Sequence, residues 1–192
     1  ILNSVYAFAK AKKKIYSHKA NMNTIKNYIS LLCLSVFFIS QISFAQSEEQ
    51  KAMAKLSYMI GDWKGTGTSY PKEQNKPYDV LSKVRYDLDG ELIVLKHRSI
   101  KDGKPVLSLH TLIYYNVEEQ QYYYYAFRRT GVRPFTGQIV EGRLICMLGD
   151  DYRLIFQRTP EGLFNEYGEK RVNDVWTKNF EDLLSPTSEI TF

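Results

Sequence analysis

His97 and His110 are the side chains in the central part of the sequence that are best suited to proton transfer or metal binding. A metal site would need carboxylates or thiols at ligand spacing, and no such set accompanies either histidine, so we expect no metal and no other cofactor. His97 is more simply interpreted as an interior histidine that contacts a ligand through a ring nitrogen. The alternative is an enzyme that uses His97, with an inward tyrosine or Arg129, for proton transfer in a cavity.

The run of four tyrosines from Tyr122 to Tyr125 is the most unusual local feature of the sequence. In a β-strand two of these rings must point to each face of the sheet. Rings that line a barrel interior would offer aromatic walls with hydroxyl tips to an amphipathic guest. One of Arg128 and Arg129 would also point inward, where it could hold a carboxylate or phosphate. Strand propensity and ring packing alone would also account for the run.

Two further features suggest chemistry but are better explained by structure. Gly65-Thr66-Gly67 lacks the following helix and the Gly-Lys-Ser/Thr ending of a phosphate loop, so its glycines are expected to bend a strand at a barrel corner. Cys146 lies in an apolar stretch with no histidine nearby in sequence, which indicates a buried, inert thiol.

The elements that would position these residues are one helix and a series of short strands. Residues 47–50 have the pattern of a capping box, and Met53, Leu56 and Ile60 follow at helical spacing, which predicts a short helix that ends at Gly61. Beyond it, runs rich in β-branched and aromatic residues recur between turn dipeptides. They lie near residues 62–70, 78–86, 91–99, 105–115, 121–130, 134–140, 143–148, 152–158, 163–170 and 174–180.

Connections this short join antiparallel neighbours only, so the strands should form an up-and-down meander. Closure into a barrel would remove both exposed edges of the sheet. We therefore predict an all-β fold, a meander of 8–10 antiparallel strands closed into a barrel with one short N-terminal helix.

Hydrophobic alternation then predicts which side chains face the interior. A two-residue turn at Asp89-Gly90 would place Ser82, Val84 and Tyr86 opposite His97, Leu95 and Ile93. A three-residue loop ending at Gly103 would bring Leu107, Leu109 and Thr111 to the same face. Applied to the connection Val117-Glu118-Glu119, the same criterion adds the following four inward residues: Tyr123, Tyr125, Phe127 and Arg129.

The positive charge of the chain is concentrated near its start. Six of the 26 Lys and Arg residues and no acidic residue lie in positions 1–45, which leaves 20 basic against 21 acidic groups in the remainder. A domain so close to neutral is not expected to bind nucleic acid, because phosphate binding needs clustered Lys and Arg.

The same segment has the pattern of a secretory signal. We interpret residues 1–21 as a non-native upstream extension, 22–45 as a signal peptide cleaved after Ala45, and 46–192 as the barrel domain. The apolar run from Ile29 to Ile39 is short for a membrane span. The mature protein is therefore expected to be exported to the periplasm or beyond, with no stable membrane span.

The predicted helix followed by Gly61-Asp62-Trp63 resembles the opening of bacterial lipocalin-like domains of the calycin group. In those families the tryptophan of a Gly-x-Trp motif packs across the barrel base, and Trp63 matches that position. The resemblance implies that a small, mostly apolar molecule binds in the central cavity. Haem-binding members of the wider group use a histidine in a late strand, which this chain lacks after His110.

These observations favour an exported binding protein that holds a small hydrophobic or amphipathic ligand. Its contacts would come from His97, Thr111, Tyr123, Tyr125, Phe127 and Arg129. A protein-interaction or structural role without a ligand, with tyrosines as the contact surface, is the alternative, ahead of the cavity enzyme.

Overall fold

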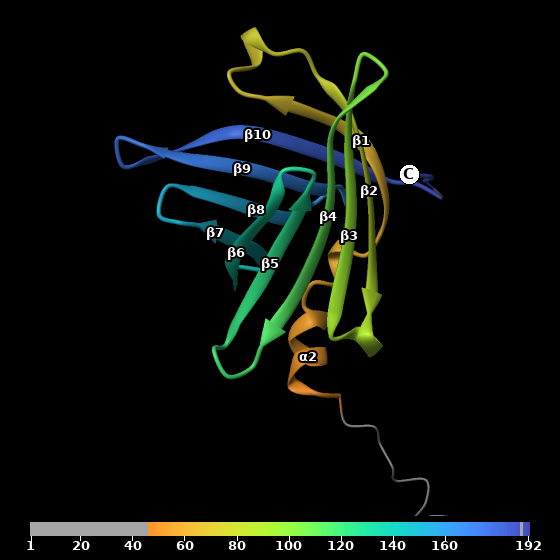
Figure 1. Cartoon of the computed structure of the whole chain (residues 1–192), viewed down its shortest axis with the longest axis vertical. Helices are drawn as coiled ribbons and strands as arrows, with labels where there is room; N and C mark the ends of the chain where they lie inside the picture. Colours follow the sequence, from red (N-terminus) through yellow and green to blue (C-terminus); the bar gives the residue numbers. More distant parts are fainter. Residues whose placement is uncertain (1–45, 189) are drawn as a thin grey trace, which may run out of the picture. The chain divides into compact units, whose positions relative to one another are not determined.

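Ten antiparallel strands close into one barrel in the computed structural model, which describes residues 46–188 and 190–192. Each strand pairs with its neighbours in sequence, and the ring is closed by pairing of the first strand with the tenth (Figure 1). The strands are β1 (Gly61–Ser69), β2 (Tyr78–Asp87), β3 (Leu92–Lys101), β4 (Lys104–Asn116), β5 (Gln121–Arg128), β6 (Gly131–Val140), β7 (Arg143–Leu148), β8 (Tyr152–Arg158), β9 (Phe164–Val172) and β10 (Val175–Pro186). The predicted all-β meander and its closure are confirmed, and the predicted extension and signal peptide lie outside the described residues.

A short helix, α2 (Glu48–Ala54), lies at one end of the barrel (Figure 1). The capping box is present: the Ser47 hydroxyl accepts a hydrogen bond from the Gln50 amide, and the Gln50 side chain accepts one from the Ser47 amide. The helix ends before the predicted Gly61, and a 3-10 turn (Ser57–Met59) leads into β1. Hydrogen bonds from the Tyr122 hydroxyl to the Ala52 carbonyl and from the Tyr58 hydroxyl to the Phe156 carbonyl join this segment to the strands.

Trp63 is buried where this segment meets the barrel. Its indole Nε1 donates to the Met59 carbonyl at 2.8 Å, and its ring lies 5.4 Å from that of Phe164. A buried indole with its N–H satisfied adds apolar contact without leaving a polar group unpaired.

Gly65 explains how β1 closes on β10. A Cβ atom at this position would lie 2.1 Å from the carbonyl oxygen of Leu183 on β10, so only glycine allows the two backbones to approach this closely. The expectation that the glycines serve the path of the first strand agrees with this close approach.

The strands β2, β3 and β4 present the expected residues to the interior. Ser82 pairs with His97, and His97 pairs with Leu109, as the alternation predicted. The predicted three-residue loop is wrong, however, because Lys101 pairs with Lys104 across a two-residue turn. A bulge at Val106 supplies the extra residue that shifts the register, so the faces are as predicted by a different route.

The predicted register of β5 is wrong by one residue. Asn116 pairs with Gln121, so the connection has four residues rather than three, and Gln120 adopts a left-handed conformation with φ 52°. Because a one-residue slip exchanges the two faces of a strand, the interior receives the other half of β5. The inward residues are Tyr122, Tyr124, Ala126 and Arg128.

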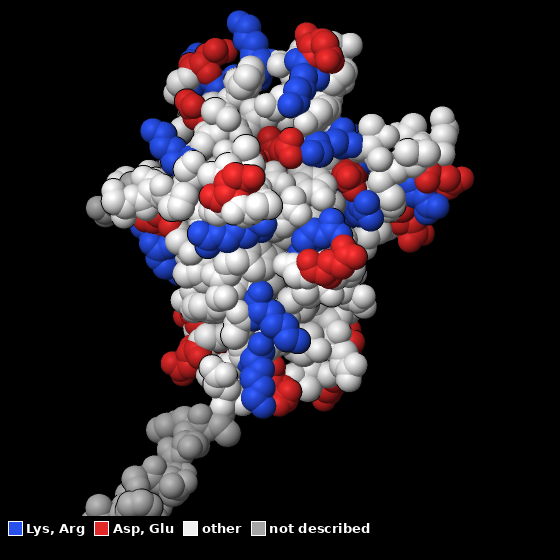
Figure 2. Space-filling model, turned by 180° about the vertical axis from the view of Figure 1, so that it is seen from behind, with Lys and Arg blue, Asp and Glu red and all other residues white. Residues whose placement is uncertain are grey.

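The interior near the helix is filled by buried apolar side chains, whereas charged side chains lie on the outer surface. The face in Figure 2 shows Lys and Arg interspersed with Asp and Glu, in keeping with the near-neutral charge of the domain. Of the helices in the described residues, none is long and apolar enough to cross a bilayer.

Candidate functional site: a cavity with aromatic walls and buried carboxyl groups

A cavity of about 210 Å³ lies inside the barrel. It reaches the barrel rim, because several of its lining residues, including Leu107, Arg128 and Asn179, are only half-buried. Five aromatic side chains contribute to its walls, and these are Tyr78, Tyr124, Phe135, Tyr152 and Phe180. The cavity therefore combines apolar walls with several polar groups and a wet entrance, as small-molecule sites often do.

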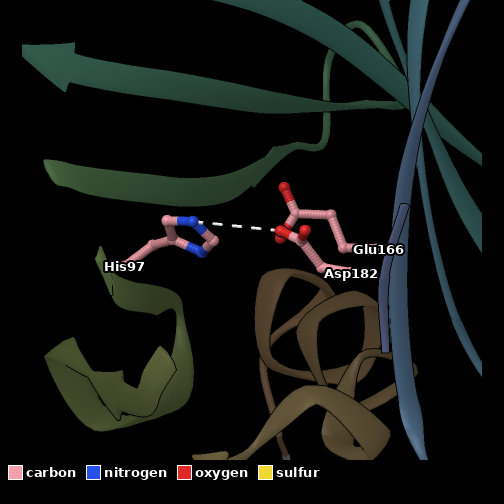
Figure 3. Close-up of side chains that lie close together, drawn as sticks. All are labelled: His97, Glu166 and Asp182. Atoms are coloured by element: carbon pink, nitrogen blue, oxygen red, sulfur yellow. Dashed lines mark ion pairs between the residues drawn. The ribbon is translucent and has the colours of Figure 1, made fainter. Parts of the chain in front are cut away.

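Three buried polar side chains meet at the wall of this cavity: His97 from β3, Glu166 from β9 and Asp182 from β10 (Figure 3). One potential ligand atom from each lies within 4.8 Å of the other two. The two carboxylates are directly opposite each other in the pairing of β9 with β10. Acidic residues at such a position repel each other when both are ionised.

His97 is held from both sides by serine hydroxyls. Its Nδ1 lies 3.0 Å from the Ser82 hydroxyl and its Nε2 lies 2.9 Å from that of Ser99. Burial lowers the pKa of His97 to about 4, so the ring is neutral at pH 7. The 3.9 Å separation of Nε2 from Asp182 Oδ2, dashed in Figure 3, is therefore not a charged pair at neutral pH and is too long for a hydrogen bond.

Asp182 is fixed by two neighbours. The Tyr78 hydroxyl donates to its Oδ1 at 3.0 Å, and the Asn165 amide donates to its backbone carbonyl at 3.1 Å. Gly67 makes room for the first of these contacts, because a Cβ there would lie 2.1 Å from the Tyr78 ring and 2.2 Å from Asp182 Oδ1. Burial raises the pKa of Asp182 to about 7.

Glu166 is less well satisfied. Its side chain is buried, with 4% exposure, and its Oε2 has no hydrogen-bond partner among the described residues. Burial and, to a lesser extent, the Asp182 carboxylate hold the pKa of Glu166 well above its usual range. An unpaired buried carboxyl oxygen costs free energy in the isolated protein, so it marks a place where a bound group would be stabilised.

The outer rim of the cavity carries the opposite charge. Arg128 lines the cavity, and its Nε is buried without a hydrogen-bond partner in the described chain. Burial lowers the pKa of Arg128, and Arg133 acts in the same direction. The cavity thus has a carboxyl-rich wall and one guanidinium toward its edge.

The structure places the six predicted contact residues unequally. His97 lines the cavity, and Thr111 is buried inside the barrel, with its hydroxyl 3.5 Å from the Tyr124 hydroxyl, but does not line the cavity. The predicted inward positions of the other four are wrong, because the four-residue connection before β5 turns them outward. These outward residues are Tyr123, Tyr125, Phe127 and Arg129.

The outward tyrosines form a stack on the surface. The Tyr114 ring lies parallel to that of Tyr123 at 5.2 Å and to that of Tyr125 at 6.1 Å, and Phe127 next to them is 40% exposed. The four-tyrosine run therefore divides as expected, two rings to each face, with Tyr124 rather than Tyr123 at the cavity.

Glu166 and Asp182 were missed by the sequence reasoning, although one signal was present. Phe180, Asp182 and Leu184 alternate along β10, so the aspartate occupies an inner position of an otherwise apolar face. The predicted strand ended at residue 180, which left Asp182 outside it. The meeting of Glu166 with His97 depends on barrel closure and has no local signal.

Comparison with known proteins supports the barrel and no more specific assignment. No protein-family model and no curated protein matches this chain. Among solved structures, the chain is similar to the crystal structure of Rv2717c from M. tuberculosis, with 13% sequence identity and a TM-score of 0.50. The match covers 74% of this chain and 99% of that chain. At this level of identity the likeness shows the fold alone, a β-barrel.

Proposed function

We propose that this protein is an exported, lipocalin-like binding protein that holds a small aromatic or amphipathic molecule in the barrel cavity. The observation that carries the proposal is a cavity of about 210 Å³ with five aromatic side chains in its walls and hydrogen-bonding groups on one side. A cavity of roughly 150 Å³ accommodates benzene, whereas sites for drug-sized ligands usually span roughly 300–1,000 Å³. The expected guest is therefore a single substituted ring.

The polarity of the walls indicates how such a guest would lie. Its ring would pack against the Tyr124 and Phe135 side chains in the cavity wall, and its polar substituent would face the carboxyl groups of Glu166 and Asp182. The half-buried Arg128 would contact the part of the guest nearest the entrance. A neutral or cationic substituent is favoured over an anionic one, because an anionic substituent would be repelled by whichever carboxyl group is ionised.

Titration with three small probes, each a single substituted ring, tests both the cavity and its polarity. Phenol, benzylamine and benzoate are added separately to chelator-treated protein while chemical shifts are followed by NMR. We expect phenol and benzylamine to shift signals of cavity residues and benzoate to bind more weakly. Absence of binding by all three probes would refute the proposed function.

A variant that fills the cavity provides the matched comparison. Ala126 is buried, with 1% exposure, and lines the cavity, so Ala126→Leu should remove probe binding. Ala54→Leu, at an exposed position of α2, introduces the same side chain outside the cavity and should leave binding unchanged. Circular dichroism would establish that both variants keep the barrel.

A protein-interaction role is the second candidate, and the surface stack of Tyr114, Tyr123 and Tyr125 favours it. Aromatic rings that are partly exposed, as these are, are enriched at protein interfaces. Self-association is the directly measurable form of this role. Sedimentation velocity would then show dimers that Tyr125→Ser dissociates, without any change in probe binding.

A further inference from the structure

His97, Glu166 and Asp182 form a set of possible metal ligands that the guest-binding role does not require. They come from three strands far apart in sequence, and all three side chains are at least 96% buried. Across residues 46–188 and 190–192, neither carboxylate forms an ion pair with a lysine or arginine. Two buried acidic groups without a cationic partner call for a bound cation or protons.

We propose that these three side chains bind one divalent first-row transition-metal ion, with Zn²⁺ as the reference ion, at the wall of the cavity. The geometry is close to that of a bound site. Metal bonds to nitrogen and oxygen are about 2.0–2.2 Å long, so two ligands of one ion lie at most about 4.4 Å apart. The Nε2 of His97 and Oδ2 of Asp182 are already 3.9 Å apart, and the whole set spans 4.8 Å. The remaining gap, from 4.8 Å to about 4.4 Å, is therefore one that Glu166 would have to close when the ion binds.

The groups around the ligands are those that orient metal-bound side chains. The Ser82 hydroxyl can accept from Nδ1 of His97, which leaves Nε2 as the nitrogen with a lone pair for an ion, on the side where Asp182 Oδ2 lies 3.9 Å away. The Tyr78 hydroxyl donates to Oδ1 of Asp182 and leaves Oδ2 free to bind. Oε2 of Glu166, which has no partner among the described residues, supplies the third ligand atom. Ser99, now bonded to Nε2, would rotate away when the ion enters.

The chemistry of the set defines the class of ion. Its two carboxylates balance the charge of a divalent cation, and its imidazole favours Zn²⁺, Fe²⁺ or Mn²⁺ over Ca²⁺, which takes 6–8 oxygen ligands. Three protein ligands leave at least one coordination position open. Because the ligands line the cavity, that position faces the space where a guest would lie.

Competition with a chromophoric chelator measures this site without any organic guest. The chelator-treated, full-length protein is titrated with Zn²⁺, and in a second experiment with Ca²⁺. We expect one Zn²⁺ per chain and at least tenfold weaker Ca²⁺ binding. Titration with Co²⁺ should give the visible absorption bands of a site with one nitrogen and two oxygen ligands. A wild-type protein that binds no Zn²⁺ and gives no such bands overturns the proposal, and it would show that protons alone neutralise the pair.

Matched variants assign the ligands. Loss of an outer hydrogen-bond partner typically weakens metal binding about 10- to 100-fold, so Ser82→Ala should lower Zn²⁺ affinity by about tenfold. His97→Ala and Glu166→Gln remove ligands and should each weaken binding by more than about 100-fold. The controls are His110→Ala and Glu161→Gln, which change an exposed histidine and an exposed glutamate between β8 and β9, and they should leave affinity unchanged.

The variant results have two decisive patterns. If only Ser82→Ala, His97→Ala and Glu166→Gln weaken Zn²⁺ binding, the site is supported. If only the control variants weaken it, Zn²⁺ binds on the surface and the proposal is overturned. If a ligand variant fails to fold, Ser82→Ala and the Co²⁺ spectrum of the wild type decide the question. The guest titrations use chelator-treated protein, so they measure guest binding without any metal. A protein that binds no metal can therefore still pass or fail the test of guest binding.

Discussion

We predict that the difference in stability between metal-free Asp182→Asn and the metal-free wild type depends on pH. The difference should shift in favour of the variant as the pH rises from acidic to neutral. Burial raises the pKa of Asp182 from its ordinary value of 3.8 to about 7 in the folded protein. Between these values the folded state binds more protons than the unfolded state, so this group makes stability fall as pH rises from about 4 to about 7. The asparagine variant lacks this loss. Asparagine also keeps a carbonyl that can accept from the Tyr78 hydroxyl.

The size of the effect follows from the same numbers. A difference from 3.8 to about 7 corresponds to about three pH units, and each contributes about 1.36 kcal/mol. The free energy of unfolding of Asp182→Asn minus that of the wild type should therefore rise by on the order of 4 kcal/mol between pH 4 and pH 8. The lowered pKa of His97 acts in the opposite direction, with stability rising from about pH 4 to 6.5, but it is present in both proteins and largely cancels in the difference.

Urea unfolding at several pH values in the presence of a chelator measures this difference. The fluorescence of Trp63, which is buried against Phe164, reports unfolding. Asp79→Asn, at an exposed position of β2, is the control for loss of a carboxylate outside the cavity. A change smaller than about 1 kcal/mol for Asp182→Asn, or an equal change for the control, would refute the reasoning.

Three further predictions follow, two from the geometry of the barrel and one from the predicted signal peptide. Gly67→Ala should separate the Tyr78 ring from the Asp182 carboxylate and lower the melting temperature. Gly142→Ala lies at a turn with open space around it and should cost only about 1 kcal/mol of stability despite its positive φ. Equal losses of stability in calorimetry would contradict this prediction. Burial raises the pKa of the Cys146 thiol, so a chromogenic disulfide reagent should react with it in urea and not in native buffer; rapid native reaction would mean that the strand opens. Expression in a bacterium with an export system should yield a mature protein starting at Gln46, as read by intact mass, and retention of residues 22–45 would contradict the predicted signal peptide.

The strand order could be predicted because turn dipeptides and short apolar runs are local signals. Asp102 and Gly103, for example, both have positive φ, as their two-residue hairpin requires. The capping box at Ser47 is equally local and was found for the same reason. Closure followed from the physical cost of leaving strand edges unpaired, and the structure bears it out.

The site was harder to predict because it depends on registers and on contacts between distant strands. The alternation of β5 is ambiguous, since tyrosines occupy both of its faces, and a single extra residue at Gln120 decided which of them turned inward. In β4 a bulge at Val106 and a shorter turn compensated each other, so the correct face followed from an incorrect loop. His97 was identified as an inward residue, whereas its nearness to Glu166 and Asp182 arises only when β9 and β10 complete the ring.

Because β1 pairs with β10, the barrel cannot close until the last strand of the chain is available. Trp63 pairs with Pro186, and the Thr187 amide donates to the Asp62 carbonyl at 2.9 Å. The two strands that close the ring are therefore the first and the last to be synthesised. Until β10 is available, the other nine strands can form only an open sheet with two unpaired edges, and these edges can pair with other unfolded chains. A chaperone would be needed most in that interval, and messages truncated before the codon for Val175 should give insoluble product.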